Sequence, residues 1–186
     1  MRWLLWTALL SLPALAQTFQ VASGEARYRV REQLVGVGLT DAVGTAKAVR
    51  GEVRLQGGRV SGELAVDLRE LRSDQARRDN YLRQNTLETD RYPFATFRPK
   101  EVRGLPNPLP GQGKAAIQVV GDLTLKEVTE EVVWEGEAEF KGGEVRVFLK
   151  TEFPFEKFKL VQPRVPILLS VENRIRLEVE LLLKRQ

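Results

Sequence analysis

An alternating pattern over residues 60–68, which read VSGELAVDL, is the clearest structural signal in the chain. Every even position is apolar or glycine, while Ser61, Glu63 and Asp67 fall between them. Successive side chains of a β-strand point to opposite faces of a sheet. The alternation therefore predicts a strand with one dry face and one solvated face.

The same alternation recurs along the chain and predicts eight strands in total. They are expected around residues 27–31 and over 49–55, 60–68, 94–102, 117–125, 132–140, 145–149 and 175–183. Gly57-Gly58 and Gly142-Gly143 separate neighbouring runs by the length of a hairpin turn. The proline-rich and glycine-rich stretch 104–114 predicts a surface loop.

Eight such strands hide their apolar faces by closing into an antiparallel up-and-down barrel, and closure also removes exposed strand edges. A β-sandwich satisfies the same alternation. An eight-stranded barrel has room for its own side chains or for one slender ligand. Residues 73–85, with Ser73 or Asp74 as N-cap, predict a short helix that covers one end of this all-β domain.

The N-terminus has the pattern of an export signal. Arg2 precedes an uncharged run from Trp3 to Leu15, and the run ends in Ala14-Leu15-Ala16, a small-x-small cleavage pattern. The pattern predicts that residues 1–16 are removed and that residues 17–186 form one periplasmic or extracellular domain. An uncleaved N-terminal anchor is the alternative, although the run is shorter than the ~20 residues that cross a bilayer.

Composition argues against most catalytic chemistry. The chain has neither cysteine nor histidine, which removes thiolate nucleophiles, the commonest general base and the commonest transition-metal ligands. We predict no catalytic residue, no metal site and no cofactor. A glycosidase with two carboxylates needs neither residue type, but the glutamates fall almost entirely at outward strand positions.

Charge argues against a nucleic-acid partner, because the net charge is only +4 and the signs alternate along the chain. Arg27, Arg29 and Arg31 suit either a solvated strand face or transient contact with anionic headgroups at a membrane surface.

Two linked motifs resemble the YceI-like family. Residues 78–83 (RDNYLR) and 90–97 (DRYPFATF) are similar to its Arg-Asp-x-x-Leu helix and Tyr-Pro-x-x-x-Phe strand start, and residues 121–129 (GDLTLKEVT) to its Gly-x-Leu-Thr-x-x-Gly-Val-Thr turn. The resemblance runs from about Phe19 to the C-terminus. This chain departs from the family pattern at 32–33, 86–88, Glu127 and 153–170.

The resemblance implies an exported, lipocalin-like barrel that binds, and stores or carries, a polyisoprenoid lipid such as an isoprenoid quinone in an apolar tunnel. The candidate tunnel residues are Tyr28, Val30, Gly62, Leu64, Val66, Phe97, Gly121, Leu123, Trp134, Phe153, Phe155 and Phe158.

Several assignments stay open at this stage. Inward glycines such as Gly62 and Gly121 either make room for a lipid tail or allow barrel curvature. Arg78 either contacts a ligand headgroup or joins Asp79 in fixing the helix to the barrel. Phe153, Phe155 and Phe158 suit a mobile lid. The alternative function is an envelope-stress or structural protein with a packed barrel that acts through protein partners, and a homodimer is also compatible with the sequence.

Overall fold

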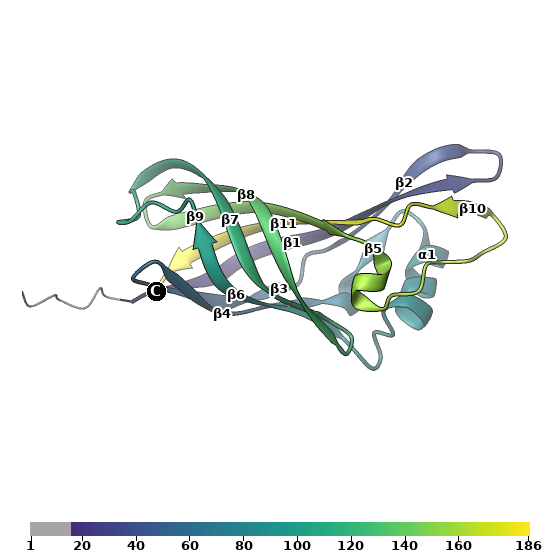
Figure 1. Cartoon of the computed structure of the whole chain (residues 1–186), viewed down its shortest axis with the longest axis horizontal. Coiled ribbons are helices and arrows are strands. Elements are labelled where there is room, and N and C mark those ends of the chain that lie inside the picture. Colours follow the sequence, from purple (N-terminus) through teal and green to yellow (C-terminus); the bar gives the residue numbers. More distant parts are fainter. Residues whose placement is uncertain (1–15) are drawn as a thin grey trace, which may run out of the picture.

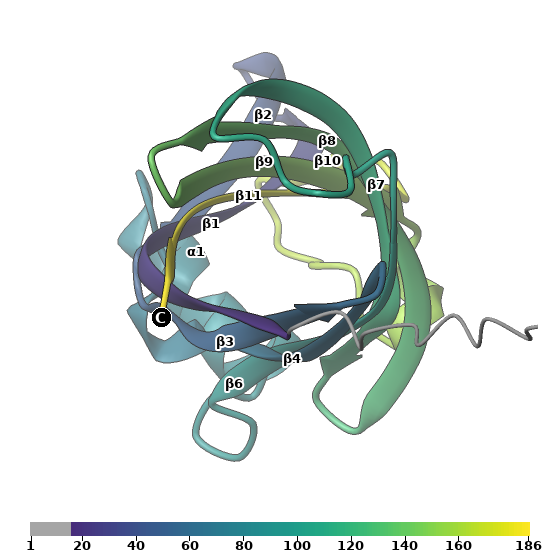
Figure 2. The same ribbon diagram turned by 90° about the vertical axis from the view of Figure 1, so that its left-hand side faces the viewer.

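The computed structural model describes residues 16–186, and eight of its strands form a closed antiparallel barrel (Figures 1 and 2). Each strand pairs with the next one in the barrel, and the last pairs with the first. The barrel strands are β1 (Gln17–Leu34), β3 (Val49–Gln56), β4 (Arg59–Asp67), β6 (Phe94–Arg103), β7 (Gln112–Leu125), β8 (Val128–Lys141), β9 (Glu144–Phe153) and β11 (Ile175–Arg185). They match the eight predicted runs, which confirms the barrel. The predicted export signal lies outside the described residues except for Ala16.

Three further strands extend the barrel at one end. The second half of β1 pairs with β2 (Gly38–Ala46), and β2 pairs with the short β5 (Arg72–Ser73). On its other edge, the end of β1 pairs with β10 (Leu168–Val171). The β1–β2 ribbon and β10 project together beyond the barrel in Figure 1. None of these three strands was predicted.

The predicted helix is α1 (Ala76–Tyr81), continued by the π-helical turn η2 (Leu82–Thr86), and it lies at the end of the barrel from which β2 projects (Figure 1). The predicted N-cap is wrong, because Gln75 precedes the helix and makes no side-chain cap bond. Ser73 instead belongs to β5, where its hydroxyl donates to Asp79, and Asp74 pairs with Arg78. No helix within residues 16–186 is long and apolar enough to cross a membrane.

Aromatic side chains pack against one another at two places in the mainly aliphatic core. Phe97 and Trp134 meet edge to face with ring centroids 5.9 Å apart. The chain has two 3-10 turns, η1 (Leu68–Glu70) and η3 (Phe155–Phe158), within the described residues. The second turn places the Phe158 ring against the Phe153 ring, with centroids 4.6 Å apart. Phe153, Phe155 and Phe158 are all buried. These three rings are therefore core residues, and the expectation of a mobile lid does not describe them.

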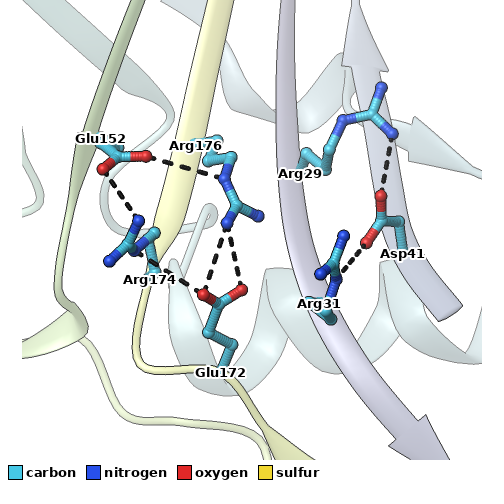
Figure 3. Close-up of polar contacts among 7 residues, drawn as sticks. All are labelled: Arg29, Arg31, Asp41, Glu152, Glu172, Arg174 and Arg176. Atoms are coloured by element: carbon cyan, nitrogen blue, oxygen red, sulfur yellow. Dashed lines mark hydrogen bonds and ion pairs between the residues drawn. The ribbon is translucent and has the colours of Figure 1, made fainter. Parts of the chain in front are cut away.

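The outer surface carries paired charges. Figure 3 shows Arg29 and Arg31 sharing Asp41, at N–O distances of 3.2 and 3.4 Å. In the same figure Arg174 and Arg176 bridge Glu152 and Glu172. Such half-exposed pairs contribute only about 0–1 kcal/mol each to stability. The fold therefore rests mainly on its closed sheet and its apolar interior.

Candidate functional site

A cavity of about 1150 Å³ occupies the barrel interior. All eight barrel strands contribute to its lining, which is mainly aliphatic and aromatic. It extends from Phe19, which pairs with Arg185 near the C-terminus, to Leu34 and Leu168, which face each other where β1 pairs with β10. The volume exceeds the ~300–1,000 Å³ usual for small-molecule sites. The interior therefore has space for a long apolar ligand.

Nine of the twelve candidate tunnel residues line this cavity. They are Tyr28, Val30, Leu64, Val66, Phe97, Leu123, Trp134, Phe153 and Phe155. Gly62, Gly121 and Phe158 are not part of the lining. Phe158 is fully buried behind Phe153, at 1% exposure.

The two glycines are explained by close packing. A Cβ atom on Gly121 would lie 2.7 Å from the Phe97 ring and 2.4 Å from the Arg98 carbonyl oxygen. Gly62 has a φ of +128°, and a Cβ there would lie 2.2 Å from the Glu52 carbonyl oxygen on the adjacent strand. Neighbouring atoms thus fill the space that a tail would need. Of the two interpretations, the geometry supports strand curvature and close approach.

Arg78 lines the end of the cavity beside α1. Its guanidinium donates to Glu32 of β1 at 2.8 Å and to Asp74 at 2.5 Å. The neighbouring Asp79 is buried and accepts hydrogen bonds from the Ser73 backbone N–H at 3.0 Å and from the Ser73 hydroxyl at 2.6 Å. Together the two side chains fix α1 to β1 and β5, while Arg78 still faces the cavity.

The charged groups of the lining are largely neutralised by one another. Four acidic residues are among those that line the cavity, and the carboxylate of each has an arginine partner, which for Asp41 is the pair Arg29 and Arg31 on the outer surface. The pairs are Glu32 with Arg78, Asp74 with Arg78, Asp41 with Arg29 and Arg31, and Glu178 with Arg27. Within residues 16–186, no group of histidine, cysteine, aspartate or glutamate side chains could hold a metal ion.

Three buried polar atoms of the described residues have no hydrogen-bond partner in the protein: the Tyr28 hydroxyl, the Thr86 hydroxyl and the Trp134 indole N–H. All three residues line the cavity. Ser73 lies near Tyr28, but its hydroxyl already donates to Asp79 and accepts from the Gln75 N–H. Buried polar groups are nearly always satisfied, so a ligand or water is the expected partner.

The pKa of Tyr28 is raised well above its ordinary value, mainly because burial disfavours the phenolate. The hydroxyl therefore stays neutral and is able to donate a hydrogen bond. Thr86 belongs to the stretch 86–88 that departs from the family pattern, but nothing in the sequence assigned its hydroxyl to the cavity. Only the three-dimensional arrangement brings it to the cavity.

The fold matches solved structures over most of its length. A polyisoprenoid binding domain from Saccharophagus degradans, implicated in plant cell wall breakdown, aligns with a TM-score of 0.73 at 13% identity, covering 90% of this chain and 98% of that one. BcnA from Burkholderia cenocepacia aligns with a TM-score of 0.64 at 17% identity over 85% and 95%. The YCEI protein from Campylobacter jejuni gives 0.57 at 18% over 77% and 84%.

No curated protein matches the sequence. The family model of the YceI-like domain matches residues 18–183, which is almost the whole described chain. This match agrees with the two motifs at 78–97 and 121–129 and with the closed barrel. The chain belongs to the YceI-like family.

Proposed function

We propose that this protein binds a long apolar isoprenoid lipid inside its barrel, outside the cytoplasm, and stores or carries it without catalysing a reaction. The observation that carries the proposal is the continuous apolar cavity of about 1150 Å³. Burial of apolar surface contributes roughly 25 cal/mol per Å², so a few isoprene units in such a cavity already supply useful affinity. A solidly packed barrel, as in the alternative function, does not fit this cavity.

The polar lining supports a neutral headgroup. The Tyr28 and Thr86 hydroxyls and the Trp134 N–H are able to donate to a carbonyl oxygen, and an isoprenoid quinone carries two carbonyls. A phosphorylated polyprenyl chain would instead need unpaired cations, whereas Arg78 and Arg27 of the lining are already paired with carboxylates and only the exposed Arg77 has no ion-pair partner within residues 16–186. The structural neighbour described as a polyisoprenoid binding domain supports the same ligand class.

Catalysis has little support in this lining. The carboxylates of the cavity are each held by an arginine, which leaves none positioned as a free general base beside a substrate. The other abundant carboxylates, such as Glu135 and Glu137 on β8, are exposed on the outside of the barrel.

Native mass spectrometry of protein purified from its own host tests the proposal. We expect a fraction of molecules to carry one extra mass, which organic extraction and fragmentation then assign to an isoprenoid chain. Consistently lipid-free protein, or a bound molecule without isoprene units, would contradict the proposal. N-terminal sequencing of the same sample tests export, since the expected mature protein begins at Gln17.

A further inference from the structure

Exposed apolar side chains gather at one end of the molecule. Among residues 16–186, eight large hydrophobic side chains are exposed, and six of them lie in two segments, 33–40 and 159–171. They are Val35, Val37, Leu39, Val161, Ile167 and Leu169. We call these two segments the apolar tip. They are joined by the pairing of β1 with β10 and by a hydrogen bond from the Val35 N–H to the Ile167 carbonyl at 3.0 Å.

The apolar tip also borders the mouth of the cavity. Val37 and Ile167 both line the cavity, although they are 68% and 56% exposed. Pro163, Val165 and Pro166 of the same segment line it as well. The cavity thus reaches the surface between the tip of the β1–β2 hairpin and the 159–171 segment, which project together in Figure 1. A ligand leaving here would pass over exposed apolar side chains.

Cations outnumber carboxylates around the mouth, where Glu32 and Asp74 are both paired with Arg78. Residues 33–40 contain no charged side chain, and residues 159–171 contain Lys159 and Arg164 but no acidic residue. Arg77, on the α1 side of the cavity, is exposed and has no ion-pair partner within residues 16–186. The ion-paired side chains on the outer surface in Figure 3 add one further positive charge, because four arginines face three carboxylates.

We propose that the apolar tip docks on the surface of an anionic lipid bilayer, with the cavity mouth facing the membrane. An exposed apolar patch rimmed by cations matches the acyl boundary and the negative headgroups of such a surface. The inference rests on the proposed function, since a polyisoprenoid that enters directly from the bilayer never crosses water. Two copies joined tip to tip would instead bring Lys159 and Arg164 of both chains together.

Vesicle flotation tests the inference, with vesicles of phosphatidylcholine alone and of phosphatidylcholine mixed with phosphatidylglycerol. We expect the protein to float with the mixed vesicles and to be released by salt. Val37→Asp combined with Ile167→Asp should abolish flotation, and Arg164→Gln should weaken binding to the mixed vesicles about fivefold. Val133→Asp and Phe148→Asp are matched controls, because both side chains are exposed on outward strand positions outside the tip.

Equal flotation of the tip variant and the wild type, or equal loss in the controls, would overturn the inference. So would a halving of the solution mass in the tip variant, because it would identify a second copy as the occupant. Lipid retention is measured separately by native mass spectrometry. Protein that retains lipid but does not float refutes only the membrane docking, whereas protein that floats but never holds lipid refutes the proposed function.

Discussion

Tyr28 is the residue that best separates a ligand contact from a structural one, because its buried hydroxyl has no hydrogen-bond partner among residues 16–186. We expect Tyr28→Phe to leave the melting temperature unchanged or slightly higher, since the variant no longer buries an unsatisfied polar group. It should weaken binding of a polyprenyl quinone by roughly 1 kcal/mol, the usual value of one hydrogen bond. Titration with a quinone and with a polyisoprenoid hydrocarbon checks this, and equal loss for both ligands would contradict a headgroup contact.

The raised pKa of Tyr28 gives a second test at the residue scale. Because burial disfavours the phenolate in the folded state, the folded protein keeps its full stability below the unfolded pKa of this tyrosine and loses stability as the pH rises above it. The unfolded value is about 10. We therefore expect the wild type to lose stability relative to Tyr28→Phe above about pH 10. Melting curves of both proteins across that range would show parallel behaviour if the hydroxyl were solvated.

At the scale of elements, the attachment of α1 depends on Asp79. Its carboxylate is buried and accepts from both the N–H and the hydroxyl of Ser73 on β5. Asp79→Ala leaves the Ser73 N–H without this partner, which should cost about 1–3 kcal/mol. Asp74→Ala is the control, because the Asp74 side chain is 73% exposed and its ion pair with Arg78 should contribute less than about 1 kcal/mol.

Thermal melts beside a lipid titration distinguish the two roles of this region. Lower stability of Asp79→Ala with unchanged affinity per folded molecule is the expected outcome. A large loss of affinity at an unchanged melting temperature would instead assign Asp79 to the ligand.

The elements that the sequence revealed are those with a regular environment. The eight barrel strands alternate between a dry interior and solvent, so their period of two was readable. Strands β2 and β10 could not be recognised from the sequence, because they extend beyond the barrel, where exposed residues such as Leu39 and Leu169 break the alternation. Gly62 followed the inward phase in sequence, but the register between β4 and β6 shifts between Arg59 and Leu64. A sequence pattern of period two does not reveal such an irregularity in strand pairing.

Across the whole molecule, the candidate site was predictable in composition but not in extent. Inward positions such as Leu64 and Leu123 follow from strand phase and line the cavity as expected. The position of the cavity mouth does not follow from the inward or outward phase of the strand residues, since it depends on how the 159–171 segment returns to pair with β1. The unsatisfied hydroxyl of Thr86 likewise depends on which atoms surround it.

Because the cavity occupies the barrel interior, an obstruction inside it should limit the length of the chain that binds. Leu123 is buried on β7, pairs with Phe97 and lines the cavity. Leu123→Trp should obstruct the interior and leave space only for a shorter chain. Because affinity grows with the apolar area buried, we expect little loss for short polyprenyl quinones and a loss that increases with tail length.

The control for this prediction is Val133→Trp, which adds a similar bulk on the outer face of β8. Overpacking alone costs ~1–3 kcal/mol, so both variants must first be shown to melt cooperatively. Calorimetric titration with a series of tail lengths then provides the measurement. Equal weakening at every length would indicate general destabilisation. Unchanged binding of the longest tail by folded Leu123→Trp would show that the tail does not pass Leu123, and the cavity would then need a different occupant.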